Sequence, residues 1–269
     1  MGKVRLDAFL AERGLSQSRE KGRREIIAGW VRVDGETVRD PSKKITGNER
    51  VTVERPGGIF VSRGGEKLKA ALEFFRIDMT GRRALDLGAS TGGFTDCMLK
   101  NGAIKVYAVD VGYNQIDYSL RKDSRVVVME KTHARDIHPG MFSEKIDFFT
   151  ADLSFISILK VLPAVSAVFD SVEGVILLKP QFEALPSQLK KGVVRSIEHH
   201  VEIVKRVVSG IPGTGFIPAG ITYSPIKGPA GNIEFLVYLK KGLFCGPEAV
   251  LLSEEDIIRT VETAHNELD

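Results

Sequence analysis

Three glycines and an acid between residues 86 and 93 have the spacing of a ligand-binding turn. An apolar run ends near Asp86, and Gly88, Gly92 and Gly93 follow it. Small residues let the backbone approach a ligand, and a buried strand entering such a loop and then a helix is the first turn of a doubly wound sheet. Residues 83–94 are therefore predicted to cradle a cofactor. The predicted contacts there are Asp86, Gly88, Ala89, Ser90, Thr91, Gly92 and Phe94.

The same loop distinguishes between cofactors. A nicotinamide-binding turn would show GxGxxG and a nucleoside-triphosphate loop would carry a lysine, whereas residues 86–94 contain neither. S-adenosylmethionine fits better, because Asp86 could pair with its ammonium group and Asp110 could accept hydrogen bonds from both ribose hydroxyls. Asp110 ends the next apolar run, and Val111 follows it as a further predicted contact. A glycine turn that serves only core packing is the alternative interpretation.

Alternating apolar runs and amphipathic segments after residue 83 predict the elements that position this loop. Their order indicates an α/β fold with a mainly parallel, Rossmann-like sheet and helices on both faces. Because no helical pattern separates the last two strands, they are predicted to be antiparallel at one sheet edge. The predicted strands span residues 84–88, 105–111, 126–130, 146–151, 175–179, 216–223 and 233–240, and the predicted helices span residues 92–100, 114–121, 156–169, 196–209 and 252–266.

The front of the chain differs in pattern and in charge. Two helical patterns precede a strand pattern around Asp34-Gly35, a type I′ hairpin signal, so residues 1–54 are predicted to be a small α+β domain. Residues 1–70 contain 16 Lys and Arg against 10 Asp and Glu, whereas the remainder contains 22 against 25. A polyanion is the expected partner of the basic part, with a merely solvated surface as the alternative. Residues 55–60 are predicted to link this domain to one at residues 61–269.

Residues 3–54 resemble the S4-type RNA-binding domain, in which a helix pair and a hairpin present basic side chains to RNA. Such side chains neutralise phosphates without reading the base sequence. A solvated basic helix is the alternative interpretation. The RNA contacts that we expect from this resemblance and from the charge are Arg5, Arg19, Lys21, Arg23, Arg24, Arg32 and Arg63.

Longer motifs make the chain resemble the TlyA family over essentially its whole length. They are VSRGGEKL at 61–68, ADLSFIS at 151–157, LKPQFE at 178–183 and GPAGNIE at 228–234. That family is described as ribosomal RNA 2′-O-methyltransferases with an S4-type domain before an FtsJ-like, class I methyltransferase domain. The resemblance implies S-adenosylmethionine as cofactor and cytidine ribose of ribosomal RNA, free or in ribosomal subunits, as acceptor. It implies a catalytic tetrad of Lys67, Asp152, Lys179 and Glu234, with Asp152 also at the cofactor and Asp136 near its adenine.

The implied tetrad suits an alcohol acceptor. A ribose 2′-hydroxyl is a weak nucleophile, so its methylation needs a base or a cation at the hydroxyl and in-line positioning. We assign that role to Lys179. Two carboxylates favour its charged form, whereas burial and Lys67 oppose it, so two roles stay open: a base, or a charged stabiliser of the developing alkoxide. Neither the target nucleotide nor the ribosomal subunit follows from the sequence.

Composition argues against other classes of protein. No apolar run approaches the roughly 18 residues of a membrane span, which disfavours the membrane-lytic activity implied by the family's other label, haemolysin. Cys97 and Cys245 form no CxxC pair, so neither a disulfide framework nor a metal site is expected. A cytoplasmic location and a monomer are the defaults. A noncatalytic RNA-binding or assembly factor, and a methyltransferase with a base-nitrogen or small-molecule acceptor, are the remaining alternatives.

Overall fold

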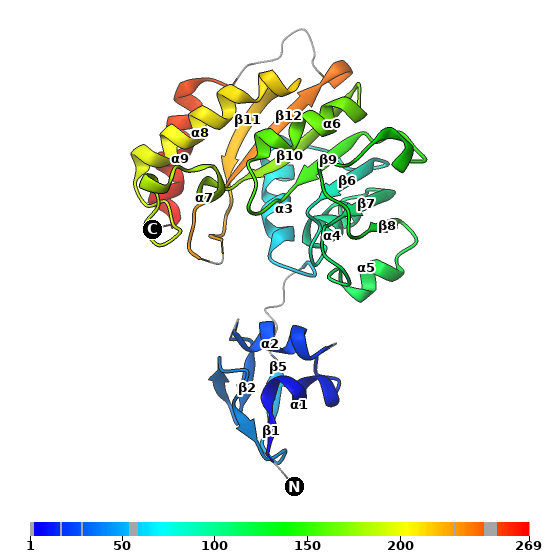
Figure 1. Ribbon diagram of the computed structural model, residues 1–269, viewed down its shortest axis with the longest axis vertical. Helices are drawn as coiled ribbons and strands as arrows, with labels where there is room; N and C mark the ends of the chain where they lie inside the picture. Colours follow the sequence, from blue (N-terminus) through cyan, green and yellow to red (C-terminus); the bar gives the residue numbers. More distant parts are fainter. Residues whose placement is uncertain are drawn as a thin grey trace. The chain divides into compact units, whose positions relative to one another are not determined.

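The structure is a computed structural model that describes residues 3–16, 18–27, 29–53, 59–228, 230–244 and 252–268. The chain divides into two compact units, Met1–Ile59 and Phe60–Asp269 (Figure 1). Most of the predicted linker at residues 55–60, and the predicted domain end at residue 54, lie outside the described residues, as does Cys245.

The first unit combines two helices with short antiparallel strands. Leu6 and Leu10 of the first helix and Ile26 of the second are fully buried in one small core with Val31. Asp34 and Gly35 have φ values of 52° and 88°, as a type I′ turn requires, and they join two paired strands as predicted. The elements are β1 (Val4–Arg5), α1 (Leu6–Glu12), α2 (Arg19–Ile27), β2 (Val31–Val33), β3 (Glu36–Val38), β4 (Lys44–Ile45) and β5 (Val51–Val53).

The second unit alternates strands and helices around one sheet. Its strands are β6 (Arg83–Leu87), β7 (Lys105–Val109), β8 (Val126–Met129), β9 (Phe148–Ala151), β10 (Val172–Leu178), β11 (Ile217–Tyr223) and β12 (Phe235–Lys241). Its α-helices are α3 (Gly64–Phe75), α4 (Gly93–Lys100), α5 (Tyr118–Lys122), α6 (Leu162–Val168), α7 (Pro180–Glu183), α8 (Ile197–Gly210) and α9 (Glu254–Leu268). Among the described residues, 3₁₀-helices occupy Pro139–Met141, Ile158–Lys160, Pro186–Gln188, Pro212–Thr214 and Gly242–Phe244.

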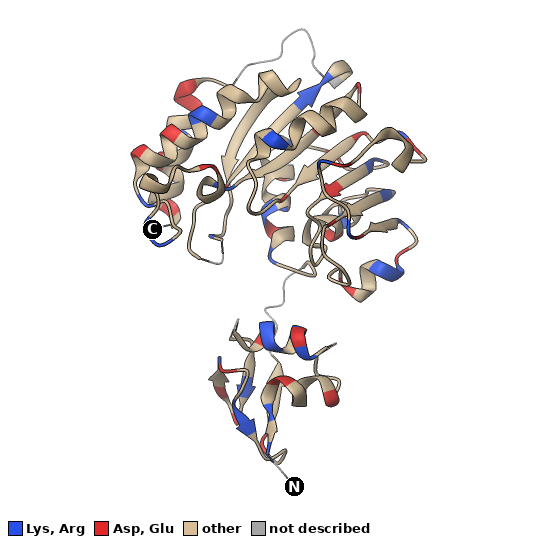
Figure 2. Cartoon of the chain, viewed as in Figure 1, with Lys and Arg blue, Asp and Glu red and all other residues tan. Residues whose placement is uncertain are grey.

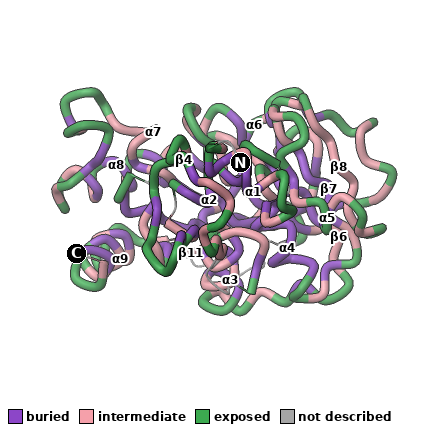
Figure 3. The backbone as a smooth tube through the Cα atoms, turned by 90° about the horizontal axis from the view of Figure 1, so that it is seen from below, coloured by how far each residue is buried: buried purple, intermediate pink, exposed green. Residues whose placement is uncertain are grey.

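The sheet has the order β11-β12-β10-β9-β6-β7-β8. The strands from β10 to β8 are parallel, and β12 is antiparallel to both of its neighbours. This arrangement confirms the predicted Rossmann-like sheet and its antiparallel last strand. Most residues of the central strands β6 and β7 are buried, and buried residues are drawn in purple in Figure 3.

Helices cover both faces of the sheet. One apolar cluster joins α6, α8 and α9 to the sheet through residues such as Val165, Val204 and Val261. A second cluster joins α3 and α4 to the other face through residues such as Leu68 and Met98. The parallel strands therefore end at one shared edge, between two packed helical layers.

Two helices begin four or more residues later than predicted, and each has a local cause. The helix predicted at residues 114–121 begins at Tyr118, because Asn114 has a left-handed φ of 55° and the Asp117 side chain accepts a hydrogen bond from Ser119 N. The helix predicted at residues 156–169 starts as a 3₁₀-helix, and α6 begins at Leu162. Pro163 has no N–H and favours the first turn of a helix.

Candidate functional site

Two ion pairs, one buried and one half-buried, contain the four residues of the implied tetrad. Lys67 Nζ lies 2.5 Å from Glu234 Oε2, and their side chains are 10% and 1% exposed. Lys179 Nζ lies 2.6 Å from Asp152 Oδ1, and it also donates a hydrogen bond to Ser154 Oγ at 3.1 Å. Each ammonium group is therefore held by a carboxylate from a distant part of the chain.

Strand register brings the two pairs together. Leu178 of β10 is paired with Phe235 of β12, so Lys179 and Glu234 are the next opposing residues beyond the end of that ladder. Leu87 of β6 is paired with Ala151 of β9, which puts Asp152 beside the glycine loop. The four side chains thus gather where the parallel strands end, at the edge where doubly wound sheets bind ligands.

Close backbone contacts fix the loop against both pairs. Gly88 has a φ of +83°, and a Cβ atom there would lie 2.3 Å from the carbonyl oxygen of Asp152. A Cβ atom at Gly93 would lie 2.9 Å from the backbone nitrogen of Gly65, in the first turn of α3. Glycine is therefore required at both positions, and this packing sets the start of α3, with Lys67, against the loop.

A cavity of about 490 Å³ opens beside these residues. The glycine loop, the ends of β7 and β9, and residues 132–135 and 152–156 line it. Of the predicted cofactor contacts, Gly88, Ser90, Asp110, Val111 and Asp152 line the cavity. Its size falls within the usual range for small-molecule sites, and its lining includes polar side chains such as Asp110 and Asp152.

Asp110, the predicted ribose-binding carboxylate, lines the cavity. Its Oδ2 atom accepts a hydrogen bond from Ser90 N at 2.8 Å, and its Oδ1 atom accepts one from Gly112 N at 2.7 Å. An ionised carboxylate has about four lone-pair positions, so both oxygens can accept further hydrogen bonds from a ligand. The two backbone donors hold the carboxylate at the cavity wall.

Asp86 lies beneath the loop, with no exposed surface. Its oxygens accept hydrogen bonds from Thr95 Oγ1 at 2.7 Å and from Thr150 Oγ1 at 2.9 Å. Burial raises its pKa to about 6, against the hydrogen bonds from the two threonines. Asp86 does not line the cavity, so its predicted contact with a ligand ammonium stays a prediction for which this structure offers no direct path.

The other predicted cofactor contacts lie outside the cavity lining. Ala89, Gly92 and Phe94 are buried within or below the loop, and Thr91 is half-buried. The backbone of Thr91 accepts a hydrogen bond from Asp117 N. Asp136 is exposed and is absent from the lining, whereas the segment just before it contributes His133 and Arg135.

Sequence reasoning did not assign a role to Phe155, the most exposed large apolar side chain of the described residues. It is 91% exposed and has a left-handed φ of 64°. Its ring centroid lies 5.0 Å from that of Phe182, and Lys179 Nζ lies 5.9 Å from the Phe182 centroid. Glu183 holds this loop, because its Oε1 atom accepts a hydrogen bond from Ile158 N. Burial raises the pKa of Glu183.

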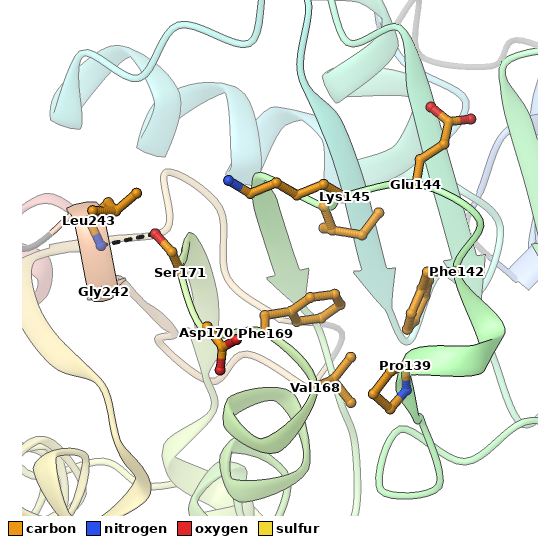
Figure 4. Close-up of a pocket in the computed structure, with 11 residues that line it drawn as sticks. Pro139, Phe142, Glu144, Lys145, Val168, Phe169, Asp170, Ser171, Gly242 and Leu243 are labelled. Atoms are coloured by element: carbon orange, nitrogen blue, oxygen red, sulfur yellow. Dashed lines mark hydrogen bonds between the residues drawn. The ribbon is translucent and has the colours of Figure 1, made fainter.

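A second cavity of about 630 Å³ lies at the opposite edge of the sheet (Figure 4). Its lining includes Phe142, Lys145 and Phe169, which precede the starts of β9 and β10. None of the predicted site residues lines it. Since doubly wound sheets bind ligands beyond the carboxyl ends of their strands, we assign the candidate site to the smaller cavity.

Basic and acidic residues lie close along the ribbon of the first unit (Figure 2), and several of the predicted RNA contacts there are paired with acids. Asp7, a nearly buried acid, pairs with Arg5 at 2.8 Å and with Arg19 at 3.4 Å, and the two arginines remain exposed. Arg24 pairs with Glu20 at 2.7 Å. Arg32 donates a hydrogen bond to the Gly35 carbonyl, and Arg23 is exposed. In the second unit, Arg63 is exposed just before α3, and Lys21 of the first unit is half-buried.

Within the parts of the chain that the structure describes, none of the helices is both long and apolar enough to cross a membrane. No group of three or more His, Cys, Asp or Glu side chains there could hold a metal ion. Cys97 is buried, and burial raises the pKa of its thiol to about 12.

The chain matches known proteins along nearly its whole length. The model of the FtsJ-like methyltransferases matches residues 60–241, and that of the S4 domain matches residues 4–51. The chain is 42% identical to the 16S/23S rRNA (cytidine-2′-O)-methyltransferase TlyA of Mycobacterium tuberculosis, over 88% of this chain and 90% of that protein. It is 43% identical to Hemolysin A of Brachyspira hyodysenteriae, over 87% of this chain and 99% of that protein.

A solved structure extends the similarity to three dimensions. A protein from Streptococcus thermophilus shares 39% identity and a TM-score of 0.77 with this chain, covering 99% of this chain and 97% of its own. The family match covers more than half of the residues, and it includes all four residues of the implied tetrad. The chain therefore belongs to the FtsJ-like methyltransferases, in the group that contains TlyA, with an S4 domain ahead of the methyltransferase domain.

Proposed function

We propose that the protein transfers a methyl group from S-adenosylmethionine to a ribose 2′-hydroxyl of ribosomal RNA. The observation that carries the proposal is the grouping of Lys67–Glu234 and Lys179–Asp152 at the carboxyl edge of the sheet, beside the smaller cavity. Family membership implies S-adenosylmethionine as the methyl donor. The name of the Mycobacterium tuberculosis relative supports cytidine as the acceptor nucleotide, in one or both ribosomal subunits.

The residues around the cavity fit this donor. Asp110 can accept the ribose hydroxyls, Gly88 and Ser90 let the backbone come close, and the negative charge of Asp152 suits a cationic ligand. When bound, S-adenosylmethionine supplies an electrophilic methyl group on a positively charged sulfur. We assign cofactor binding to the predicted set of Asp86, Gly88, Ala89, Ser90, Thr91, Gly92, Phe94, Asp110, Val111, Asp136 and Asp152, with Asp86 acting from beneath the loop.

Lys179 is the group that acts on the acceptor hydroxyl. Lys179 is paired with Asp152 and donates one hydrogen bond to Ser154 Oγ, and because an ammonium has three donors it can also donate to the ribose oxygen. In this ion-paired form Lys179 stabilises negative charge on that oxygen as the hydroxyl proton is lost to solvent. Asp152, at 2.6 Å, orients the ammonium group, and Lys67 with Glu234 fixes the neighbouring wall.

Phe155 and Phe182 offer a surface for the target base. RNA enzymes and RNA-binding domains recognise unstacked bases by stacking them on aromatic side chains. A nearly fully exposed phenylalanine in a left-handed conformation is costly, and such strain is found where the position serves a ligand. A base stacked there would bring its own ribose toward Lys179, whose Nζ atom lies over the ring of Phe182.

The S4 domain supplies RNA affinity. We propose residues 1–54 as this domain, residues 55–60 as a linker and residues 61–269 as the methyltransferase domain. Arg5, Arg19 and Arg24 are exposed yet paired with acids, so we expect them to exchange an acidic partner for phosphate on binding. Arg23, Arg32 and, just before α3, Arg63 add further exposed positive charge, and Lys21 adds a half-buried one.

The test is transfer of a labelled methyl group onto unmethylated 30S and 50S ribosomal subunits, followed by mapping of alkali-resistant linkages. The wild type should introduce 2′-O-methyl label, and Lys179→Ala should lower the rate at least about 100-fold. Isothermal titration should give both proteins the same affinity for S-adenosylmethionine within about threefold. Lys145→Ala, at the opposite edge of the sheet, is the control and should match the wild type.

Three outcomes would overturn parts of this proposal. Absence of 2′-O-methyl label on either subunit would defeat the activity and favour a noncatalytic RNA-binding role. Equal turnover by Lys179→Ala would defeat the assignment of that residue. Lys179→Arg keeps the charge and cannot act as a base, so complete loss with that variant would favour the base over the charged stabiliser.

A further inference from the structure

A two-residue hairpin turn between α7 and α8 carries positive charge to which the proposed mechanism assigns no role. Lys190 and Val193 form an isolated antiparallel bridge, and Lys191 and Gly192 between them have φ values of 53° and 77°. The segment 189–195 contains three cations, Lys190, Lys191 and Arg195, and no acid. All three are exposed, and no ion pair joins any of them to another described residue.

The turn contains a residue type that its backbone does not favour. A type I′ turn needs positive φ at both central positions, and asparagine or aspartate is the usual first residue because a lysine there is strained. Lysine at position 191 therefore makes the turn less stable than asparagine would. A strained residue at this position suggests that its charge serves a function other than forming the turn.

Asn232 ties this turn to the loop that carries Glu234. Its side chain is 2% exposed, donates a hydrogen bond to the Gly192 carbonyl at 3.2 Å and accepts one from Val194 N at 3.1 Å. Its own carbonyl accepts a hydrogen bond from Gly228 N at 2.9 Å. Val194, next to the turn, is buried, so the turn is anchored by this apolar side chain as well as by Asn232.

The clamp places the turn beside the proposed site. Glu234 follows Asn232 by two residues and pairs with Lys67, and Gly228 packs so closely on Glu234 that a Cβ atom there would lie 2.7 Å from Oε1. The turn is thus hydrogen-bonded to Asn232, which precedes Glu234 by two residues. This connection holds the charge at the tip of the turn near the acceptor side of the site.

We propose that the hairpin turn at residues 190–193 is a second RNA contact, in which Lys190 and Lys191 bind backbone phosphates of the strand that carries the target nucleotide. The inference rests on the proposed function, because it takes RNA as the substrate. Phosphate contacts position a strand without reading its sequence, which is what in-line transfer to one ribose requires. Asn232 is the positioning residue that holds the two lysines in register with Glu234.

The test uses the full chain and the variant Lys190→Gln/Lys191→Asn. Asparagine suits the left-handed position, so the variant removes two charges while it favours the turn. The control is Lys145→Gln/Arg76→Asn, which removes two exposed cations elsewhere, one of them also at a left-handed position with a φ of 54°. Binding to unmethylated 30S and 50S subunits is measured between 50 and 200 mM salt, together with methyl transfer.

We expect the hairpin variant to lower kcat/KM for the subunits about tenfold at 0.15 M salt, with unchanged affinity for S-adenosylmethionine. The slope of log K against log salt should become shallower by about 1.4 to 1.8, the loss of two phosphate contacts. The control should keep the wild-type slope. A wild-type slope and rate in the hairpin variant would overturn the proposal.

Two further outcomes distinguish the hairpin contact from the methyl-transfer activity and from the role of Asn232. If the wild type binds RNA with the expected slope difference but transfers no methyl label, the proposed function fails and the hairpin contact stands. Asn232→Ser keeps both lysines and loosens the clamp, so it should lower kcat/KM and speed hydrogen exchange of the Val194 amide. Full activity in Asn232→Ser would overturn the positioning role of Asn232.

Discussion

Lys67 of α3 and Glu234, 167 residues later, form an ion pair that is almost completely closed to solvent. Breaking a buried pair by removing one charge leaves the other uncompensated. Glu234→Gln should therefore lower the free energy of unfolding of the methyltransferase domain by about 3–5 kcal/mol in urea denaturation. The double variant Lys67→Met/Glu234→Gln should recover at least half of that loss, while methyl transfer stays low in both.

The same helix provides the control. Lys69 pairs with Glu73 at 2.6 Å, one turn further along α3, but that pair is exposed. Glu73→Gln should change the free energy of unfolding by less than about 1 kcal/mol, because exposed pairs contribute little. Equal losses for Glu73→Gln and Glu234→Gln would contradict the importance of burial. Full methyl-transfer activity in the double variant Lys67→Met/Glu234→Gln would show that the ion pair has no catalytic role.

Gly88 tests the contact between the cofactor loop and Asp152. Gly88→Ala adds a Cβ atom 2.3 Å from a backbone oxygen, whereas Gly81→Ala, at a similar φ of +73°, meets no atom within 4 Å. Both variants should lose about 1–2 kcal/mol of stability from the left-handed conformation. Only Gly88→Ala should also weaken S-adenosylmethionine binding, by at least about tenfold in isothermal titration. Equal cofactor affinities in the two variants would show that the close approach is unimportant.

Asp86 should make stability depend on pH in a defined window. Its folded-state pKa is about 6, above its ordinary value of 3.8, so the native state binds the proton more tightly than the unfolded state. Its contribution is fully present below pH 3.8 and is lost as pH rises through about 6. The stability difference between Asp86→Asn and the wild type should therefore shift in favour of the variant between pH 4 and 7, by at most about 3 kcal/mol.

Urea denaturation of both proteins across that range checks this prediction. Other carboxylates titrate in both proteins, so their effects cancel in the difference. Two pH profiles that run parallel from pH 4 to 7 would mean that Asp86 titrates with an ordinary pKa, and the account of its burial would fail.

Replacing Phe155 should lower the reaction rate with RNA and leave the affinity for S-adenosylmethionine unchanged. Phe155→Ala removes one face of the proposed stacking surface and should lower kcat/KM for ribosomal subunits about 5- to 150-fold, as loss of a base stack predicts. Phe155→Gly should show the same loss without a lower melting temperature, because glycine relieves the left-handed φ. Phe74→Ala, an exposed phenylalanine on α3, is the control. A matching loss in that control would refute the stacking role.

Sequence patterns predicted most of the second unit because its strands are short, buried and separated by amphipathic helices. Asp34-Gly35 and the two antiparallel edge strands were also predictable, since turn type and loop length determine those connections. Helix starts at residues 118 and 162 differed from the prediction, because capping by Asp117 and the position of Pro163 outweighed apolar periodicity.

The candidate site was harder to predict in detail. Motifs identified Lys67, Asp152, Lys179 and Glu234, yet their arrangement as two separate ion pairs depends on strand register, which the motifs do not contain. Asp86 was expected at the ligand because it ends a strand, but the hydroxyls of two threonines from other elements enclose it. The hydrogen bonds of Asn232 join residues about 40 positions apart, so local sequence does not predict them. Local sequence likewise does not predict that Phe155 is exposed.

The position of β12 has a consequence for synthesis of the protein. This strand is the last to leave the ribosome, yet it lies between β10 and β11, which are made earlier. Until Glu234 has been translated, β11 has no neighbour in the sheet and Lys67 has no counter-charge. A nascent chain can therefore form the Lys179–Asp152 pair before the Lys67–Glu234 pair, and premature termination before residue 234 would release a protein with a cofactor loop and an incomplete acceptor site.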